Sequence, residues 1–297
     1  MAELEQSPVR ALGKTGASVS AIGVGTNRWN KGANDAAVFE TYEALVAGGV
    51  DFIDTAEIYG LGKSERLIGD CIARDPRPVK VASKFAPFVA RTSPRQLLAA
   101  LDASLARLGL KTLDLYYIHF PFAFANLDAL ADAMVEAVRA GKTRFVGVSN
   151  FNAGQMRRIA ERLARSNLPL AANEVSYSLL NRKAESNGVL DACRELDVAL
   201  VAYFPLASGR LAASTAAPGE GAAALPKTLA GVAEARAATI AQVALAWLLR
   251  RDPHVILIPG ATKPRHAAEN IAAMTLRLTD EDFAAIDTAS ATGRRAS

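Results

Sequence analysis

The sequence of 297 residues predicts a (β/α)8 barrel, an α/β fold of eight parallel strands each followed by a helix, in one domain spanning residues 1–297. Three observations support this fold class. Short apolar runs alternate with longer stretches of helical periodicity along the whole chain. These short runs are apolar on both faces, as parallel strands covered on both sides are. The first predicted strand is also not followed by a G-x-G-x-x-G turn, which an open nucleotide-binding sheet carries there.

The strands are expected at residues 19–25, 51–56, 79–84, 113–119, 143–149, 170–177, 199–206 and 255–260. Amphipathic segments between them predict helices at 35–47, 64–74, 94–107, 127–140, 153–165, 187–196 and 239–250. Thr92-Ser93-Pro94 has the pattern of a helix start, and Gly141 that of a helix end. Residues 9–20 precede the first strand and are expected to form a β-hairpin that caps the lower end of the barrel.

Residues 207–227 interrupt the alternation, because they are rich in Ala, Gly, Ser and Pro and carry little periodicity. They follow the seventh strand on the face where barrel active sites lie. A mobile lid over a cofactor is one interpretation, and a plain insertion is the other.

Composition narrows the classes of function. The net charge is only +4, and basic residues are not concentrated in one stripe, so no nucleic-acid partner is expected. No apolar run approaches the length of a membrane span, and the polar first residues do not resemble a signal peptide. The two cysteines, Cys71 and Cys193, lie far apart in predicted helices, so we expect no disulfide, no metal site and a cytoplasmic location.

Polar side chains interrupt the apolar strands at their carboxyl ends. They are Asp54, Lys84, His119, Ser149, Asn150, Asn173 and Glu174. In a barrel these ends meet at one rim, where catalytic residues lie. The predicted active site is therefore this rim.

The residue types at this rim suit protonation of a carbonyl oxygen. Tyr59 follows Asp54 by five residues and can face the same mouth. A free tyrosine has a pKa of about 10, and Lys84 is expected to lower it, while Asp54 pairs with Lys84. His119 is expected to orient the substrate oxygen. Because none of these groups supplies hydride, a nicotinamide cofactor is implied.

At this point the sequence resembles the aldo-keto reductase family over nearly its whole length. The motifs that carry the resemblance are RALGKTGASVSAIGVGT, DFIDTAEIYGLGKSERLIG, VASKF, DLYYIHFP, GKTRFVGVSNF, NEVSYSLL, VAYFPLASGRL and IPGATKPRHAAEN, in this order. The resemblance implies reduction of an aldehyde or ketone by NADPH, or the reverse oxidation, with NADH as the alternative cofactor. It assigns Tyr59 as the acid, assisted by Lys84, Asp54 and His119.

The resemblance also implies the binding residues. Ser149, Asn150 and Glu174 would hold the carboxamide of the cofactor, Tyr203 would stack on the nicotinamide, and Thr262, Lys263 and Arg265 would bind the ribose phosphate. The remaining expected cofactor contacts are Gly25, Thr26, Pro205, Leu206, Gly209, Gly260, Glu269 and Asn270. A small carbonyl substrate would meet Trp29, Tyr59, Phe88, His119 and Phe120. For the aromatic residues among these, packing at the barrel rim stays open as the other interpretation.

Three positions depart from the usual family pattern. Glu174 replaces a common glutamine, so it cannot donate a hydrogen bond while ionised. Phe204 replaces a frequent serine, and Gly260 and His266 replace a lysine and an arginine of some branches. The preference for NADPH over NADH therefore depends on Lys263 and Arg265.

Two alternative functions remain. One is a regulatory protein that binds NADPH with negligible turnover, because such relatives can keep the whole catalytic set. The other is a barrel enzyme that uses a metal or a lysine Schiff base, although no third ligand accompanies Asp54 and His119 at the strand ends.

Overall fold

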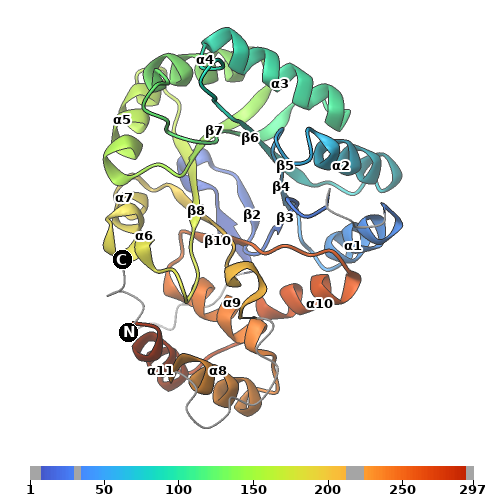
Figure 1. The fold of residues 1–297 in the computed structure, drawn as a ribbon, viewed down its shortest axis with the longest axis vertical. Coiled ribbons are helices and arrows are strands. Elements are labelled where there is room, and N and C mark those ends of the chain that lie inside the picture. Colours follow the sequence, from blue (N-terminus) through green and yellow to red (C-terminus); the bar gives the residue numbers. More distant parts are fainter. Residues whose placement is uncertain (1–7, 30–34, 212–223, 292–297) are drawn as a thin grey trace.

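A barrel of eight parallel strands forms the centre of the molecule, with helices around it (Figure 1). The computed structural model describes residues 8–29, 35–211 and 224–291. The barrel strands are β3 (Val24–Gly25), β4 (Phe52–Asp54), β5 (Lys80–Phe85), β6 (Leu113–Ile118), β7 (Thr143–Ser149), β8 (Leu170–Ser176), β9 (Ala199–Tyr203) and β10 (Val255–Ile258). Each strand pairs with the next in the chain, and bridges Ile22–Leu257 and Gly25–Gly260 join the last strand to the first. The predicted barrel is therefore confirmed.

The helices follow the strands as expected, and further helices come near the C-terminal end. They are α1 (Asp35–Ala47), α2 (Lys63–Arg74), α3 (Pro94–Leu108), α4 (Leu127–Arg139), α5 (Ala153–Ala164), α6 (Lys183–Ser186), α7 (Val189–Leu196), α8 (Ala224–Ala235), α9 (Ile240–Arg251), α10 (Pro264–Ala273) and α11 (Asp280–Ala291). The predicted start at Ser93 is confirmed, because its hydroxyl accepts from the amide of Gln96 while Pro94 takes the first helical position.

The N-terminal hairpin is also confirmed, with β1 (Val9–Ala11) antiparallel to β2 (Ser18–Ser20). Leu12 and Val19 of this hairpin pack into the interior of the barrel, together with apolar side chains of the strands. Between them lies the short 3-10 helix Gly13–Thr15. A Cβ at Gly13 would lie 2.8 Å from two backbone oxygens of the barrel, so only glycine permits this close approach. The hairpin thus closes one end of the barrel, and the site lies at the other.

Three expectations about the elements need correction. The run 19–25 is not one strand, because residues up to Ser20 pair within the hairpin and only Val24–Gly25 enters the barrel. The predicted helix 187–196 is two helices, α6 and α7, separated at Gly188, which has a positive φ of 79°. The segment 207–227 is not all irregular, because a 3-10 helix covers Ala207–Gly209 and α8 begins at Ala224. The lid interpretation concerns mainly residues 212–223, which lie outside the described residues.

Candidate active site

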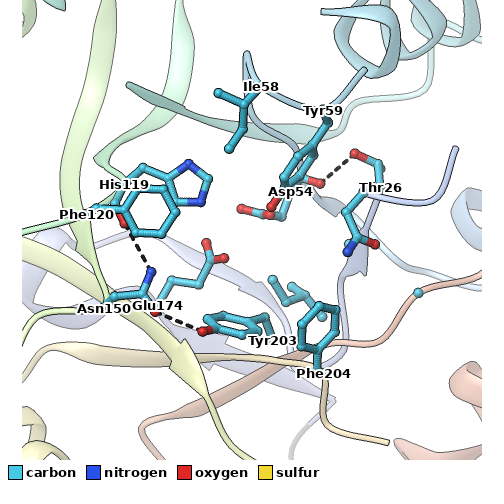
Figure 2. A pocket seen from close by; sticks show the side chains of 14 residues that line it. Thr26, Asp54, Ile58, Tyr59, His119, Phe120, Asn150, Glu174, Tyr203 and Phe204 are labelled. Atoms are coloured by element: carbon cyan, nitrogen blue, oxygen red, sulfur yellow. Dashed lines mark hydrogen bonds between the residues drawn. The ribbon is translucent and has the colours of Figure 1, made fainter. Parts of the chain in front are cut away.

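A cavity of about 240 Å³ opens at the carboxyl ends of the strands, on the side opposite the hairpin (Figure 2). Its lining comes from β3, β4, β8, β9, β10 and the loops that follow the strands, and consists of Gly25, Thr26, Asn27, Asp54, Ile58, Tyr59, His119, Phe120, Asn150, Glu174, Tyr203, Phe204, Ile258 and Gly260. Nine of these fourteen residues belong to the set expected from the sequence.

Lys84 lies at the base of this cavity and is completely buried. Its ammonium pairs with the Asp54 carboxylate and donates to the backbone oxygen of Thr55 at 2.8 Å. The rings of Tyr59 and Tyr117 lie 5.4 and 5.5 Å from its nitrogen. Burial alone disfavours the ammonium, but the carboxylates of Asp54 and Glu174 outweigh it and raise the pKa of Lys84 above its usual value. Lys84 is therefore charged at neutral pH.

Tyr117 reaches the ammonium because β7 leaves room for its ring. The two strands are neighbours, and Tyr117 pairs with Gly147. A Cβ at Gly147 would lie 2.6 Å from the Tyr117 ring, so any larger residue would displace it. Glycine at this position lets an aromatic side chain fill the barrel beneath the site.

Asp54 is held in place by its own backbone as well as by Lys84. The Asp54 carbonyl oxygen accepts from the Thr26 hydroxyl at 2.9 Å. The Ser64 hydroxyl donates to Thr26 at 2.8 Å and accepts from Thr55 at 3.0 Å. This chain of buried hydroxyls joins β3, β4 and α2. It fixes the end of β4, from which the loop to Tyr59 departs.

The second carboxyl group at Lys84 is that of Glu174, whose Oε2 lies 3.2 Å from the ammonium. Glu174 is 2% exposed, and its carboxyl points into the cavity toward Asp54 (Figure 2). Burial and the Asp54 carboxylate raise the pKa of Glu174 well above its usual value. The base of the cavity thus holds two carboxyl groups and a single ammonium.

Tyr59 projects into the cavity from the loop after β4, and its ring meets that of His119 edge-on at 6.3 Å between centroids. The expectation that Lys84 lowers the net pKa of Tyr59 is wrong for this structure. Burial and the carboxylates of Asp54 and Glu174 raise the pKa of the phenol, and Lys84 only partly offsets them. The phenol therefore carries its proton at neutral pH.

His119 follows β6 and is 6% exposed. Burial and the nearby Lys84 ammonium lower its pKa to about 2, so the imidazole is neutral at physiological pH. Its Nδ1 is buried without a hydrogen-bond partner. A neutral imidazole has one donor and one acceptor, which suits a hydrogen bond to a carbonyl oxygen.

Ser149, Asn150 and Tyr203 form a polar cluster beside Glu174. The Ser149 hydroxyl and the Asn150 amide donate to the Glu174 backbone oxygen at 3.0 and 2.8 Å. The Asn150 side chain donates to the backbone oxygen of His119 at 3.1 Å and accepts from the Tyr203 hydroxyl at 2.9 Å. Asn150 adopts a positive φ of 64°, which asparagine tolerates better than most residues. Three strands thus present hydrogen-bonding groups to one side of the cavity.

The expected phosphate-binding residues gather at the start of α10. Lys263 is the N-cap and Pro264 the first helical residue, while Arg265 is exposed in the first turn and Thr262 is half-buried. Further along, Asn270 is 4% exposed and its side-chain nitrogen has no hydrogen-bond partner, while Glu269 is half-buried. The remaining expected contacts follow β9, where Pro205 is buried, Leu206 half-buried and Gly209 exposed.

Two of the residues expected at the substrate lie outside the cavity lining. Trp29 is completely buried, and its indole nitrogen donates to the backbone oxygen of Ala261 at 2.7 Å. Phe88 is 48% exposed and pairs with Arg91 in a short turn. Asn27, Ile58 and Ile258, by contrast, line the cavity and were not expected. Ile58 precedes Tyr59 directly, so its place in the same motif was the available signal.

Among the described residues, no group of three or more His, Cys, Asp or Glu side chains is placed to hold a metal ion. Both cysteines are buried as free thiols. No single described helix is long and apolar enough to cross a membrane, although α8 and α9, bent by 97°, reach that length and composition together.

Comparisons with known proteins agree with this geometry. The family model described as "Aldo/keto reductase family" matches residues 21–291. The aldo-keto reductase str7 of Strobilurus tenacellus is 33% identical over 273 residues, which cover 84% of this chain and 79% of that relative. A crystal structure of a thermostable aldo-keto reductase with the inhibitor epalrestat superposes with a TM-score of 0.83 at 33% identity, covering 95% of this chain and 99% of the other. An aldo/keto reductase from Klebsiella pneumoniae in complex with NADP and acetate gives 0.79 at 31% identity, covering 94% of each chain.

Proposed function

The chain belongs to the aldo/keto reductase family and is an NAD(P)H-dependent oxidoreductase, and from this premise we propose that Tyr59 protonates the oxygen of an aldehyde or ketone substrate. The observation that carries the proposal is the meeting of Tyr59, His119 and the Lys84–Asp54 pair at one cavity. The reverse oxidation uses the same groups in the opposite direction. Reduction with NADPH is the proposed direction.

The cavity supports a nicotinamide cofactor through its unpaired and paired polar groups. Asn150 and Glu174 face the cavity and offer an amide and a carboxyl to the carboxamide, and the Tyr203 ring offers a stacking surface. Asn270 leaves a buried donor unpaired, which a cofactor atom would satisfy. Lys263 and Arg265 at the start of α10 supply two cations for a phosphate, which favours NADPH over NADH. When bound, the reduced nicotinamide supplies hydride to the carbonyl carbon.

The other groups act on the carbonyl oxygen. The neutral His119 donates a hydrogen bond to it and holds it near the phenol. Tyr59 then gives up its proton as negative charge develops on that oxygen. Lys84 stabilises the resulting phenolate, because its charge lies 5.4 Å from the ring in a buried site. Asp54 keeps the ammonium oriented.

A Tyr59→Phe variant tests the proposal directly. Removing the hydroxyl abolishes the proton donor but leaves the ring in the cavity. We expect kcat for reduction of a simple aldehyde to fall by about 10²-fold or more, with little change in the dissociation constant of NADPH. Steady-state assays and a fluorescence titration of NADPH measure the two quantities. Full activity of Tyr59→Phe would show that another group is the acid.

The alternative of a regulatory NADPH-binding protein makes a different prediction for the unmodified chain. That protein would retain NADPH tightly but oxidise it negligibly with any member of a broad aldehyde and ketone panel. The complete set of Tyr59, Lys84, Asp54 and His119 in one cavity favours the working enzyme.

A further inference from the structure

The inference concerns the charge at the base of the cavity, and it rests on the proposed function because it requires a nicotinamide cofactor. Asp54, Lys84 and Glu174 are each no more than 2% exposed. The Lys84 ammonium contacts Asp54, the Thr55 backbone oxygen and, at 3.2 Å, Oε2 of Glu174. One positive charge therefore stands between two buried carboxyl groups.

The groups around Glu174 provide no second positive charge. Asp54 faces it from β4, Lys84 from β5, Tyr117 from β6 and Tyr203 from β9, while Tyr59 approaches from the loop after β4. The phenols are neutral, and burial keeps the imidazole of His119 neutral as well, with its pKa at about 2. No arginine and no other lysine lines the cavity among the described residues. With both carboxyls ionised, the buried cluster would carry an uncompensated negative charge, which burial strongly disfavours.

The hydrogen bonds show where an extra proton fits. Oδ2 of Asp54 and Oε2 of Glu174 are both buried and have no partner that donates to them. The two carboxyl groups face each other and interact as a hydrogen-bonded pair, in which a protonated carboxyl donates to the other, ionised one (Figure 2). Burial raises the pKa of both carboxyl groups. A glutamine at position 174, the usual residue of the resembling family, would leave Asp54 and Lys84 as a balanced pair without such a proton.

We propose that Asp54 and Glu174 share one proton in the cofactor-free site, and that binding of the oxidised nicotinamide cofactor expels this proton to solvent. The oxidised ring is cationic and the reduced ring is neutral. A ring stacked on Tyr203 would lie beside Glu174, because both side chains line the same cavity. The cation replaces the proton as the partner of the second carboxylate.

The direction of the pH dependence follows from linkage. Binding of the cationic ring lowers the pKa of the shared proton, so oxidised cofactor binds more tightly as pH rises. Release of one full proton makes the dissociation constant fall about tenfold per pH unit. The reduced cofactor has no ring charge and does not expel the proton. The ratio of the two affinities therefore changes with pH.

The test is calorimetric titration of the full chain with NADP⁺ and with NADPH, in two buffers of different ionisation enthalpy, between about pH 6 and pH 9. The difference in protons released between the two forms cancels contributions that they share, such as that of the ribose phosphate. We expect the unmodified protein to release up to about one more proton with NADP⁺ than with NADPH. The Glu174→Gln variant is expected to release equal numbers, with a ratio of affinities that does not depend on pH.

A matched control removes a carboxylate from the surface. Glu161→Gln changes a 74% exposed side chain on α5 that pairs with Arg165 at 3.2 Å, and it should behave like the unmodified protein. Equal proton release for both cofactor forms in the unmodified protein, a measurement that needs no variant, would overturn the inference. So would an undiminished difference in a Glu174→Gln protein that still binds NADPH. Failure of the unmodified protein to bind either form would instead refute the proposed function.

Discussion

At the scale of single residues, the sequence predicted which groups meet but not their protonation. Asp54, Lys84 and His119 were expected together because they end neighbouring strands of a barrel, and the strand ends converge. The pKa of Tyr59 depends instead on the sum of one ammonium and two carboxyls in a buried space. The second carboxyl, that of Glu174, was expected only at the cofactor. Its distance to Lys84 follows from strand pairing, which a list of residues does not contain.

Burial likewise separates residues of the same type. Trp29 was expected at the substrate but is completely buried beneath Ala261, whereas Phe204, 43% exposed, lines the cavity. Both are aromatic residues that directly follow strands in the sequence. The backbone turn at each position decides which way the ring points, and Phe204 has a positive φ of 52°.

His254 provides a residue-scale prediction about stability. Its ring contacts Asp252 at 2.9 Å and Asp197 at 3.4 Å, and these carboxylates raise its pKa above the ordinary value. A histidine whose pKa is raised in the folded state stabilises the fold fully below its unfolded pKa of about 6.5, and the contribution is lost as pH rises through the folded pKa. We expect His254→Gln to be destabilised most at mildly acidic pH. Urea unfolding of both proteins across this range measures the difference, and an equal loss of stability at every pH would contradict the assignment.

At the scale of elements, a row of stacked rings follows β6. His119 stacks on Phe120 at 4.1 Å between centroids, Phe120 on Phe122 at 5.2 Å, and Phe122 on Phe124 at 5.1 Å. The row runs from the cavity to the surface, where Phe124 is 48% exposed. It holds the imidazole from one side, while the orphaned Nδ1 receives no hydrogen bond that would do so. Stacking is therefore a main constraint on the orientation of His119.

This stack gives the prediction for Phe120. An aromatic pair contributes about 0.5–1.5 kcal/mol beyond simple burial, so Phe120→Ala should lower kcat/KM by about tenfold or less. Phe120→Tyr, which keeps the stacked ring, should retain most of the activity. The effect should appear with substrates too small to reach Phe120 themselves. If Phe120→Ala impaired only large aromatic substrates, Phe120 would contact substrate rather than orient His119.

The elements that the sequence missed have weak periodic patterns. α11 begins where Thr279 and Asp282 exchange backbone hydrogen bonds, a cap that the sequence T-D-E-D does contain. α8 is rich in alanine, and its apolar residues pack mainly against α9 and α11 rather than against the strands. Helices that lie outside the regular alternation of strand and helix could not be inferred from that alternation. The split of 19–25 was missed because hairpin and barrel strands have the same apolar character.

At the scale of the whole molecule, the two ends of the barrel have different tasks. The carboxyl ends of the strands hold the cavity, and the hairpin fills the opposite end with Leu12 and Val19. The hairpin is tied to the rest of the fold by Arg10, whose guanidinium donates to the backbone oxygen of Leu249 at 3.0 Å. Residues at the closed end therefore affect stability without touching the chemistry.

Leu12 tests this division of tasks. Its side chain is 1% exposed among the residues that fill the barrel, so Leu12→Ala leaves a cavity and should destabilise the fold by about 2–5 kcal/mol. Val9→Ala on the same hairpin, where the side chain is 47% exposed, should cost about 0.5 kcal/mol or less. Chemical denaturation measures both losses. Below the unfolding transition, kcat and KM of Leu12→Ala should equal those of the unmodified protein, since the strand ends that carry Asp54 and Lys84 lie at the opposite end of the barrel. A changed kcat in the fully folded variant would mean that packing at the closed end is transmitted to the site.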